Sequence, residues 1–285
     1  MTTDLAATSD PALDSASRLA AAAGATLHVI HVVASSAEAG PRAGNDASTG
    51  HEQAVRRALE RAGVAPDGHR IQIIHGDPRT TIGPLADSLK ADVIVMGRHR
   101  DSTALPAGRP VGGTAYAVIT NTAAPCLVTT RTLALPLRRV LVAIDHSETA
   151  RGALVVAISW ASALRDRAVA TSDLLAIRVE ANRPLGTSPH RTIDEDVEAL
   201  RRDGGGWAGV ALKGLTLADD DPVTAITGAA TEHDAQLVVL GTRGMRNPEP
   251  GALGSVAAAI TQRLTMPVLL VPPAIWRDYG RDISE

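Results

Sequence analysis

The stretch AQLVVLGTRGMRNPEPGALGS, residues 235–255, joins an apolar run to a glycine-rich segment that ends where a helix-like segment begins. The continuous run LVVL is typical of a strand covered on both faces, as in a parallel sheet with flanking helices. Glycines follow at once, with the spacing G-x2-G-x9-G-S from Gly241 to Ser255. Strands that alternate with helices in this way predict the doubly wound α/β class.

The same pattern occurs twice in the chain. ADVIVMGRHR, from Ala91, resembles AQLVVLGTRG, from Ala235, at an offset of 144 residues (235 − 91). APCLVTT, from Ala124, resembles MPVLLVP, from Met266, at an offset of 142 (266 − 124). Offsets that stay nearly constant indicate a tandem duplication. We therefore expect two domains of ordinary size, 1–134 and 138–275, followed by a loosely held tail, 276–285.

Each copy is expected to alternate strands and helices. The expected strands are 27–33, 70–76 and 92–97 in the first copy, and 139–145, 174–179, 236–241 and 268–272 in the second. The expected helices are 80–90, 223–233 and 255–264. Segments 39–52 and 180–192 are interpreted as loops, and the glycines of 203–206 as a helix stop.

Composition excludes several function classes. The 285 residues carry a net charge of −3 and only 2% aromatic residues, which favours neither nucleic acid nor an acidic membrane as a partner. One cysteine and scattered histidines do not form a metal-site pattern, so we expect no protein-bound metal. No apolar run approaches the ~20 residues of a membrane span, and the acidic start lacks a secretory signal, so we expect a cytoplasmic protein.

The glycine pattern of the second copy is a candidate anion site. Glycine allows close approach to main-chain amides, and the helix that starts near Ser255 presents unpaired amides and a partial positive charge. Asp145 follows the first strand of this copy, where a carboxylate can accept hydrogen bonds from a ribose or a base. Two plainer interpretations remain open: Asp145 and Ser255 can each serve as a helix N-cap. His146, next to Asp145, is interpreted as a solvent-facing loop residue.

The segments VLVAIDHS, LVVLGTRG, GALGSVAAAI and MPVLLVP, together with HGDPRTTI and ADVIVMG, resemble the universal stress protein family over nearly the whole chain. The resemblance implies two domains, each with a mainly parallel five-stranded sheet flanked by helices, and a site for an adenine nucleotide. By this resemblance ATP, with Mg²⁺ bound only through the nucleotide, would contact the second-copy residues Ala143, Asp145, Val179, Gly241, Gly244, Gly254 and Ser255.

The first copy departs from this pattern and is interpreted as a degenerate second site. Gly97 is kept, but Arg100 stands where Gly244 stands in the second copy, and the loop to Gly113 is longer. Gly113 and Thr114 restore the helix start, and Val32 corresponds to Val179. Ser9, with Asp10 beside it, is taken as the counterpart of the aspartate. Arg100 at this turn hinders the approach of a ligand to the main chain, and it also adds a positive charge that can bind phosphate.

Three functions follow from these features. The first is a tandem universal stress protein that binds ATP in its C-terminal domain and so regulates an unknown protein partner in a stress response. The second is a nucleotide-independent scaffold in which the two domains form an internal pseudo-dimer through the edge strands, with a homodimer as a further possibility. The third is a slow ATP hydrolase. We expect binding rather than catalysis, and no catalytic residue is assigned.

Overall fold

The computed structural model of the chain describes residues 1–34, 46–65, 68–98, 112–166, 168, 171–181, 193, 195, 198, 209–244 and 251–275. The chain divides into two compact units, Met1–Leu133 (unit 1) and Ala134–Glu285 (unit 2). Each unit contains parallel strands that alternate along the chain with helices, which confirms the α/β class.

The described residues of unit 2 form a parallel sheet of five strands. They are β5 (Arg139–Ala143), β6 (Ser172–Glu180), β7 (Val210–Ala218), β8 (Leu237–Gly241) and β9 (Val268–Val271). The pairings give the order β7-β6-β5-β8-β9, with every pair parallel. The central strands consist of Val, Leu and Ala residues that are almost wholly buried, as a sheet covered on both faces requires.

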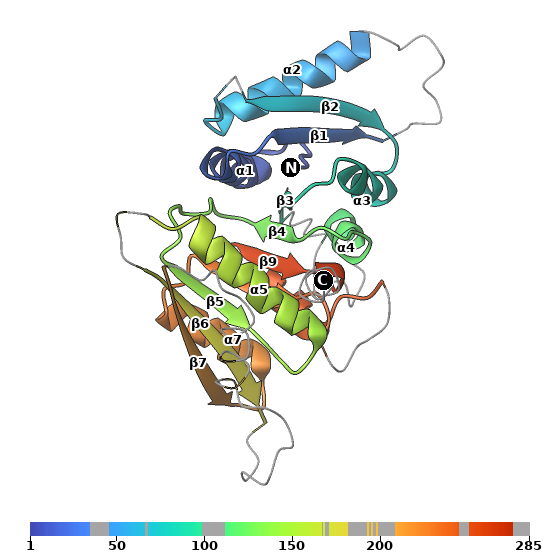
Figure 1. The fold of residues 1–285 in the computed structure, drawn as a ribbon. Coiled ribbons are helices and arrows are strands. Elements are labelled where there is room, and N and C mark those ends of the chain that lie inside the picture. The colour runs from blue at the N-terminus through green and yellow to red at the C-terminus, as the bar shows by residue number, and fades with distance from the viewer. Residues whose placement is uncertain are drawn as a thin grey trace, which may run out of the picture. The chain divides into compact units, whose positions relative to one another are not determined.

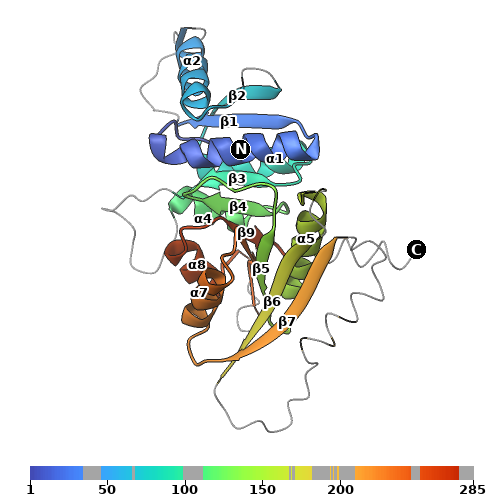
Figure 2. The ribbon, with the colours of Figure 1, turned by 90° about the vertical axis from the view of Figure 1, so that its left-hand side faces the viewer.

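Helices cover both faces of this sheet. Figure 2 shows α5 (Glu148–Ala163) on one side, and α7 (Pro222–Glu232) and α8 (Ser255–Arg263) on the other. Local chemistry sets their starts: Ser147 caps α5 by accepting from the amide of Ala150, and Asp221 caps α7 by accepting from that of Val223. The chain therefore leaves the central strand β5 toward β6 over one face and reaches β8 over the other.

Unit 1 has the same order of elements along the chain, but its described residues include no regular strand in the place that β5 takes in unit 2. Its strands are β1 (Leu27–Val33), β2 (His69–His75), β3 (Ile94–Gly97) and β4 (Cys126–Thr129). Its helices are α1 (Asp10–Ala23), which follows a short 3-10 turn, α2 (Asp46–Arg61), α3 (Pro78–Ser88) and α4 (Gly113–Thr120). Figure 1 shows α1 on one side of these strands and α3 and α4 on the other.

Residues 1–3 take the place of the central strand in unit 1. Thr2 forms parallel bridges to Ile30 of β1 and to Met96 of β3. The amide of Thr3 donates to the carbonyl of Ile30 at 3.0 Å, as the amide of Ile144 donates to the carbonyl of Ile177 in unit 2 at 2.8 Å. This shared register makes Thr3 the counterpart of Ile144.

The expected strands and helices are confirmed to within two residues, whereas one expected loop is wrong in part and one strand was not expected. Segment 39–52 was expected to be a loop, but residues 46–52 belong to α2. The buried apolar residues at helical spacing, Val55, Ala58 and Leu59, all come after residue 52, so the apolar pattern did not mark the start of this helix. The edge strand β7 was not expected at all. Residues 182–192, 203–206 and the tail 276–285 lie outside the described residues.

Candidate functional site

The residues expected to bind a nucleotide in unit 2 come from neighbouring strands at one edge of the sheet. Ala143, the last residue of β5, pairs with Leu240 of β8 on one side and Ile177 of β6 on the other. Asp145 follows β5, and Gly241 ends β8. Because connections to opposite faces leave from here, this is the switch point at which open α/β sheets bind ligands.

The structure brings Asp145 and Gly244 into direct contact. Asp145 Oδ1 accepts from the amide of Ser147 at 2.9 Å, which fixes the orientation of the carboxylate. A Cβ built on Gly244 would lie 2.7 Å from Asp145 Oδ2, so only glycine leaves the carboxylate undisturbed. Two residues 99 positions apart (244 − 145) therefore form one surface, as the sequence pattern led us to expect.

Gly241 has a packing role. A Cβ at this residue would lie 2.8 Å from Thr149 Cγ2, on the first turn of α5. Thr149 is itself only 7% exposed. Close packing of the strand end on the start of α5 thus accounts for glycine at position 241 without any ligand.

The start of α8 supplies main-chain donors. Gly254 is its N-cap, in an extended conformation with φ −59° and ψ 144°, and glycine has no side chain with which to cap. The first amides of the helix, from Ser255 to Ala257, have no carbonyl one turn earlier within the helix, so this end carries partial positive charge. Ser255 is exposed and places its hydroxyl at the same end.

Two other amides of this segment already have partners in the protein. The amide of Gly254 donates to the carbonyl of Thr242 at 2.8 Å, and that of Thr242 donates to the carbonyl of Val271 at 2.9 Å. Gly254 therefore shapes the loop rather than offering its own amide to a ligand. The donors of the candidate site are the amides at the start of α8.

In unit 1 the residue at the position equivalent to Asp145 is Asp4, not Ser9. Asp4 follows Thr3, the counterpart of Ile144, and its Oδ1 accepts from the amide of Ala6 at 3.0 Å, two residues on, as Asp145 does from Ser147. Ser9 lies beside it and donates from Oγ to Asp4 Oδ1 at 2.7 Å. The expectation that Ser9, or its neighbour Asp10, takes the aspartate position is wrong, because the 3-10 turn inserts residues before α1.

The remaining unit 1 residues are only partly brought together. Gly97 ends β3 and packs on Ser9, since a Cβ there would lie 3.0 Å from Ser9 Oγ. Val32 lies near the end of β1. Helix α4 begins at Gly113 with Gly112 as N-cap, so Gly113 stands where Ser255 does and Thr114 is the second helical residue. Arg100 lies outside the described residues.

The sequence pattern missed Asp4 and Thr149. Asp4 stands 141 residues before Asp145 (145 − 4), close to the repeat offsets of 142 and 144, and both aspartates are followed two residues later by a small residue. That offset was the available signal for Asp4. Thr149 has no such signal, because its contact with Gly241 arises only when β8 pairs with β5.

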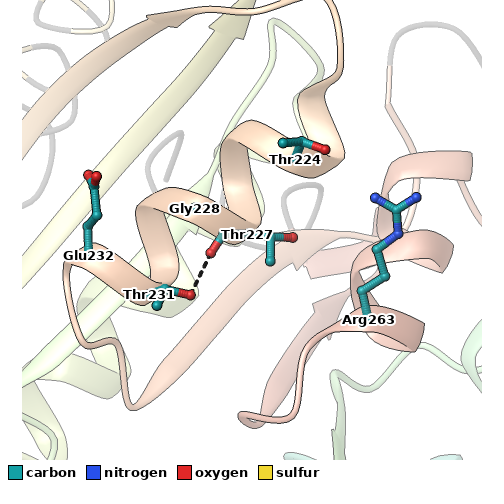
Figure 3. Close-up of a pocket in the computed structure, with 6 residues that line it drawn as sticks. All are labelled: Thr224, Thr227, Gly228, Thr231, Glu232 and Arg263. Atoms are coloured by element: carbon teal, nitrogen blue, oxygen red, sulfur yellow. Dashed lines mark hydrogen bonds between the residues drawn. The ribbon is translucent and has the colours of Figure 1, made fainter.

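A separate groove lies between α7 and α8 in unit 2. Its volume is about 450 Å³, and Figure 3 shows Glu232 and Arg263 on opposite sides of the helix face that carries Thr227 and Gly228.

Within the described part of the chain, no three His, Cys, Asp or Glu side chains cluster as metal ligands would. The helices described there also include none that is both long and apolar enough to span a bilayer.

Comparison with known proteins identifies a family model and solved structures that match this chain. The model of the universal stress protein family matches residues 1–130 and again 136–272. A universal stress protein from Archaeoglobus fulgidus DSM 4304 superposes with a TM-score of 0.66 at 19% identity, covering 95% of this chain and 94% of that one. A putative universal stress protein from Pseudomonas aeruginosa UCBPP-PA14 gives 0.55 at 16% identity, covering 94% and 90%. No curated protein matches significantly.

Proposed function

Because the chain belongs to the universal stress protein family, duplicated in tandem, we propose that unit 2 binds ATP at the carboxyl edge of its sheet. Mg²⁺ would be held by the nucleotide phosphates rather than by a cluster of protein ligands. Occupancy of the site would alter the segment after Gly244 and so regulate a protein partner. The observation that carries the proposal is the contact between Asp145 and Gly244 at the switch point.

The chemistry of the two sides of this site fits the two ends of a nucleotide. Asp145 offers carboxylate oxygens, which accept hydrogen bonds from ribose hydroxyls. The start of α8 offers amides, the Ser255 hydroxyl and a helix dipole, which together favour phosphate. The dipole contributes only ~0.3–1 kcal/mol at an exposed site, so binding depends on the amides and the carboxylate acting together.

Unit 1 lacks one of these features, which supports one nucleotide per chain. Gly113 replaces the serine at the helix start, which removes the hydroxyl. Unit 1 would then serve as a scaffold for unit 2.

Isothermal titration calorimetry of the full chain with ATP and Mg²⁺ tests this proposal. We expect a stoichiometry close to one for the wild type. Asp145→Ala should weaken binding about 10–100-fold, since a hydrogen bond to a charged group contributes about 1.5–3 kcal/mol. Gly244→Arg should abolish binding, because its side chain would occupy the space beside the carboxylate.

Gly50→Arg is the matched control. Gly50 lies on α2 of unit 1, is exposed, and has nothing within 4 Å of a built Cβ, so this variant should bind ATP like the wild type. Equal affinity in Gly244→Arg and Gly50→Arg would overturn the assigned site. Absence of binding in the wild type at millimolar ATP would instead support the nucleotide-independent scaffold.

The scaffold function has specific support in one contact. Packing on Thr149 explains Gly241 without any nucleotide. The calorimetric titration separates the two functions. The expectation that the protein is not an enzyme stays a prediction. It is tested by phosphate release: release that is lost in both Asp145→Asn and Gly244→Arg would reveal an ATP hydrolase at this site.

A further inference from the structure

The groove between α7 and α8 has a floor of small residues whose polar groups are already used. Thr224, Thr227, Gly228 and Thr231 recur along one face of α7. The Thr224 hydroxyl donates to Asp221 Oδ2 at 2.6 Å, and those of Thr227 and Thr231 donate to carbonyls one turn earlier, at 2.7 and 2.9 Å. What remains to contact a partner is mainly the methyl groups and the Gly228 backbone.

The centre of this floor is open. A Cβ built on Gly228 would meet nothing within 4 Å, and Gly228 is exposed although it lies in the middle of a helix. Glycine at such a position lowers helix stability relative to alanine. A small residue there does, however, allow the backbone of a second helix to approach closely.

Opposite charges flank the floor at different levels along α7. Glu232 ends the helix. The Arg263 side chain, from α8, lies on the side of this face away from Glu232, beyond Thr224 and Thr227 (Figure 3). After the hydrogen bonds from the Thr224 hydroxyl and the Val223 and Thr224 amides, its charge also helps to lower the pKa of the Asp221 carboxyl. Asp221 and Glu232 are 11 residues apart, which is about 16 Å along a helix. Among the described residues neither Glu232 nor Arg263 has a salt-bridge partner.

We propose that this α7–α8 face binds a second copy of the chain, with α7 antiparallel to its counterpart and Gly228 near the two-fold axis. An isologous contact requires a self-complementary surface. The antiparallel arrangement places Glu232 of each copy near Arg263 of the other. It also brings the positive end of each helix dipole next to the negative end of its partner. Asp221 remains occupied by its bonds to Thr224 and Val223.

The face is small, so the dimer is expected to be weak and concentration-dependent. Two short helices offer less than the ~800 Å² per partner of a standard interface. Sedimentation equilibrium of the full chain should therefore be run from about 5 to about 500 µM at low and at high salt. We expect a monomer–dimer equilibrium that shifts toward monomer as the salt concentration rises, because the flanking contacts are ionic.

Charge reversal tests the contact directly. Glu232→Arg and Arg263→Glu should each weaken the dimer at least about tenfold, because each places like charges in contact. The double variant Glu232→Arg/Arg263→Glu should restore wild-type association, since the pair is only exchanged. Gly228→Arg should abolish the dimer by filling the floor, whereas the matched Gly50→Arg on α2 should not.

The outcomes are distinguishable from those for nucleotide binding. Thermal unfolding should show that all variants fold, as Gly228 substitutions meet open space. A wild type that stays monomeric over the whole concentration range would overturn the proposal. So would a dimer that survives Gly228→Arg, or a double variant as weak as the single ones. ATP binding to unit 2 should be unchanged in every variant.

Discussion

Asp145 and Gly244 lie so close together that a Cβ on Gly244 would stand 2.7 Å from Asp145 Oδ2. Gly244 does not have a positive φ, so an alanine there is not strained by its backbone. The carboxylate is the end of a side chain, not backbone, and it can shift by straining its hydrogen bond from the amide of Ser147. A small substitution at Gly244 should therefore move the proposed ribose acceptor while leaving the fold intact.

This contact gives the first prediction. Gly244→Ala should weaken ATP binding about tenfold, which corresponds to the loss of about one hydrogen bond to a charged group. The free energy of unfolding, measured by urea titration, should change by less than ~0.5 kcal/mol, as is usual for substitutions away from the core. The control Gly50→Ala should leave ATP affinity unchanged. A large loss of stability without a loss of affinity would contradict the prediction.

Patterns of continuous apolar residues predicted the buried strands well, because burial on both faces leaves a strong signal. Strand 27–33 was predicted with its observed bounds. The expected strand 139–145 ends instead at Ala143, because Asp145 turns the chain by accepting the amide of Ser147. β7 escaped prediction because it is an edge strand with lysine, glycine and an exposed leucine, Leu215.

The candidate site was predictable where it depends on the repeated motif and not where it depends on the local path of the chain. The motif identified Asp145 and Gly244, which the structure brings together. It failed at Asp4 because residues 1–3 form bridges rather than a regular strand, so no apolar run marks the position. The partners of Gly241 and Gly254 depend on loop and strand contacts that spacing alone does not contain.

Gln236 provides the second prediction, for the segment that begins unit 2. Its Oε1 accepts from the amides of Arg138 and Arg139 at 2.7 and 3.0 Å, and its Nε2 donates to the carbonyls of Ala134 and Pro136, each at 3.0 Å. Gln236→Ala removes these bonds and should lower the free energy of unfolding by about 1–2 kcal/mol. The loss is no larger than this because water can replace part of the bonds at the surface.

Urea unfolding followed by circular dichroism measures this effect. Gln53→Ala is the control, since Gln53 is an exposed residue of α2, and its substitution should change stability by less than ~0.5 kcal/mol. Proteolysis offers a second readout, because loss of the Gln236 bonds should expose segment 134–139 to cleavage. Equal stability of the two variants would show that the Gln236 bonds are fully replaced by solvent.

Two helical glycines give the third prediction, with opposite signs. Gly228→Ala should raise the free energy of unfolding by ~1 kcal/mol, because its Cβ meets open space and alanine favours the helix. Gly83→Ala should lower it, since a Cβ in α3 would lie 3.1 Å from the carbonyl oxygen of Asn121, which is backbone and yields poorly. Both are measured by urea unfolding at low micromolar concentration. The same sign in both variants would contradict the packing of α3 on α4.

Cys126 gives the fourth prediction, for pH dependence. Burial raises the pKa of its thiol, because the charged thiolate is disfavoured in the core between Ala124 and Leu127. The native protein should therefore not react with a thiol reagent between pH 7 and pH 9, where an ordinary thiol with a pKa of about 8.5 becomes reactive. In denaturant, one thiol per chain should react.

The same shift links pH to stability. The folded chain keeps the Cys126 proton while the unfolded chain loses it, so the free energy of unfolding should fall as pH rises above the unfolded pKa of about 8.5. Cys126→Ala removes this contribution, although it leaves a small cavity that lowers stability at every pH. The informative measurement is the slope of stability against pH between 8 and 10, which should be steeper in the wild type than in Cys126→Ala. Identical slopes, or rapid native labelling at pH 8, would show that the thiol reaches solvent in the folded state.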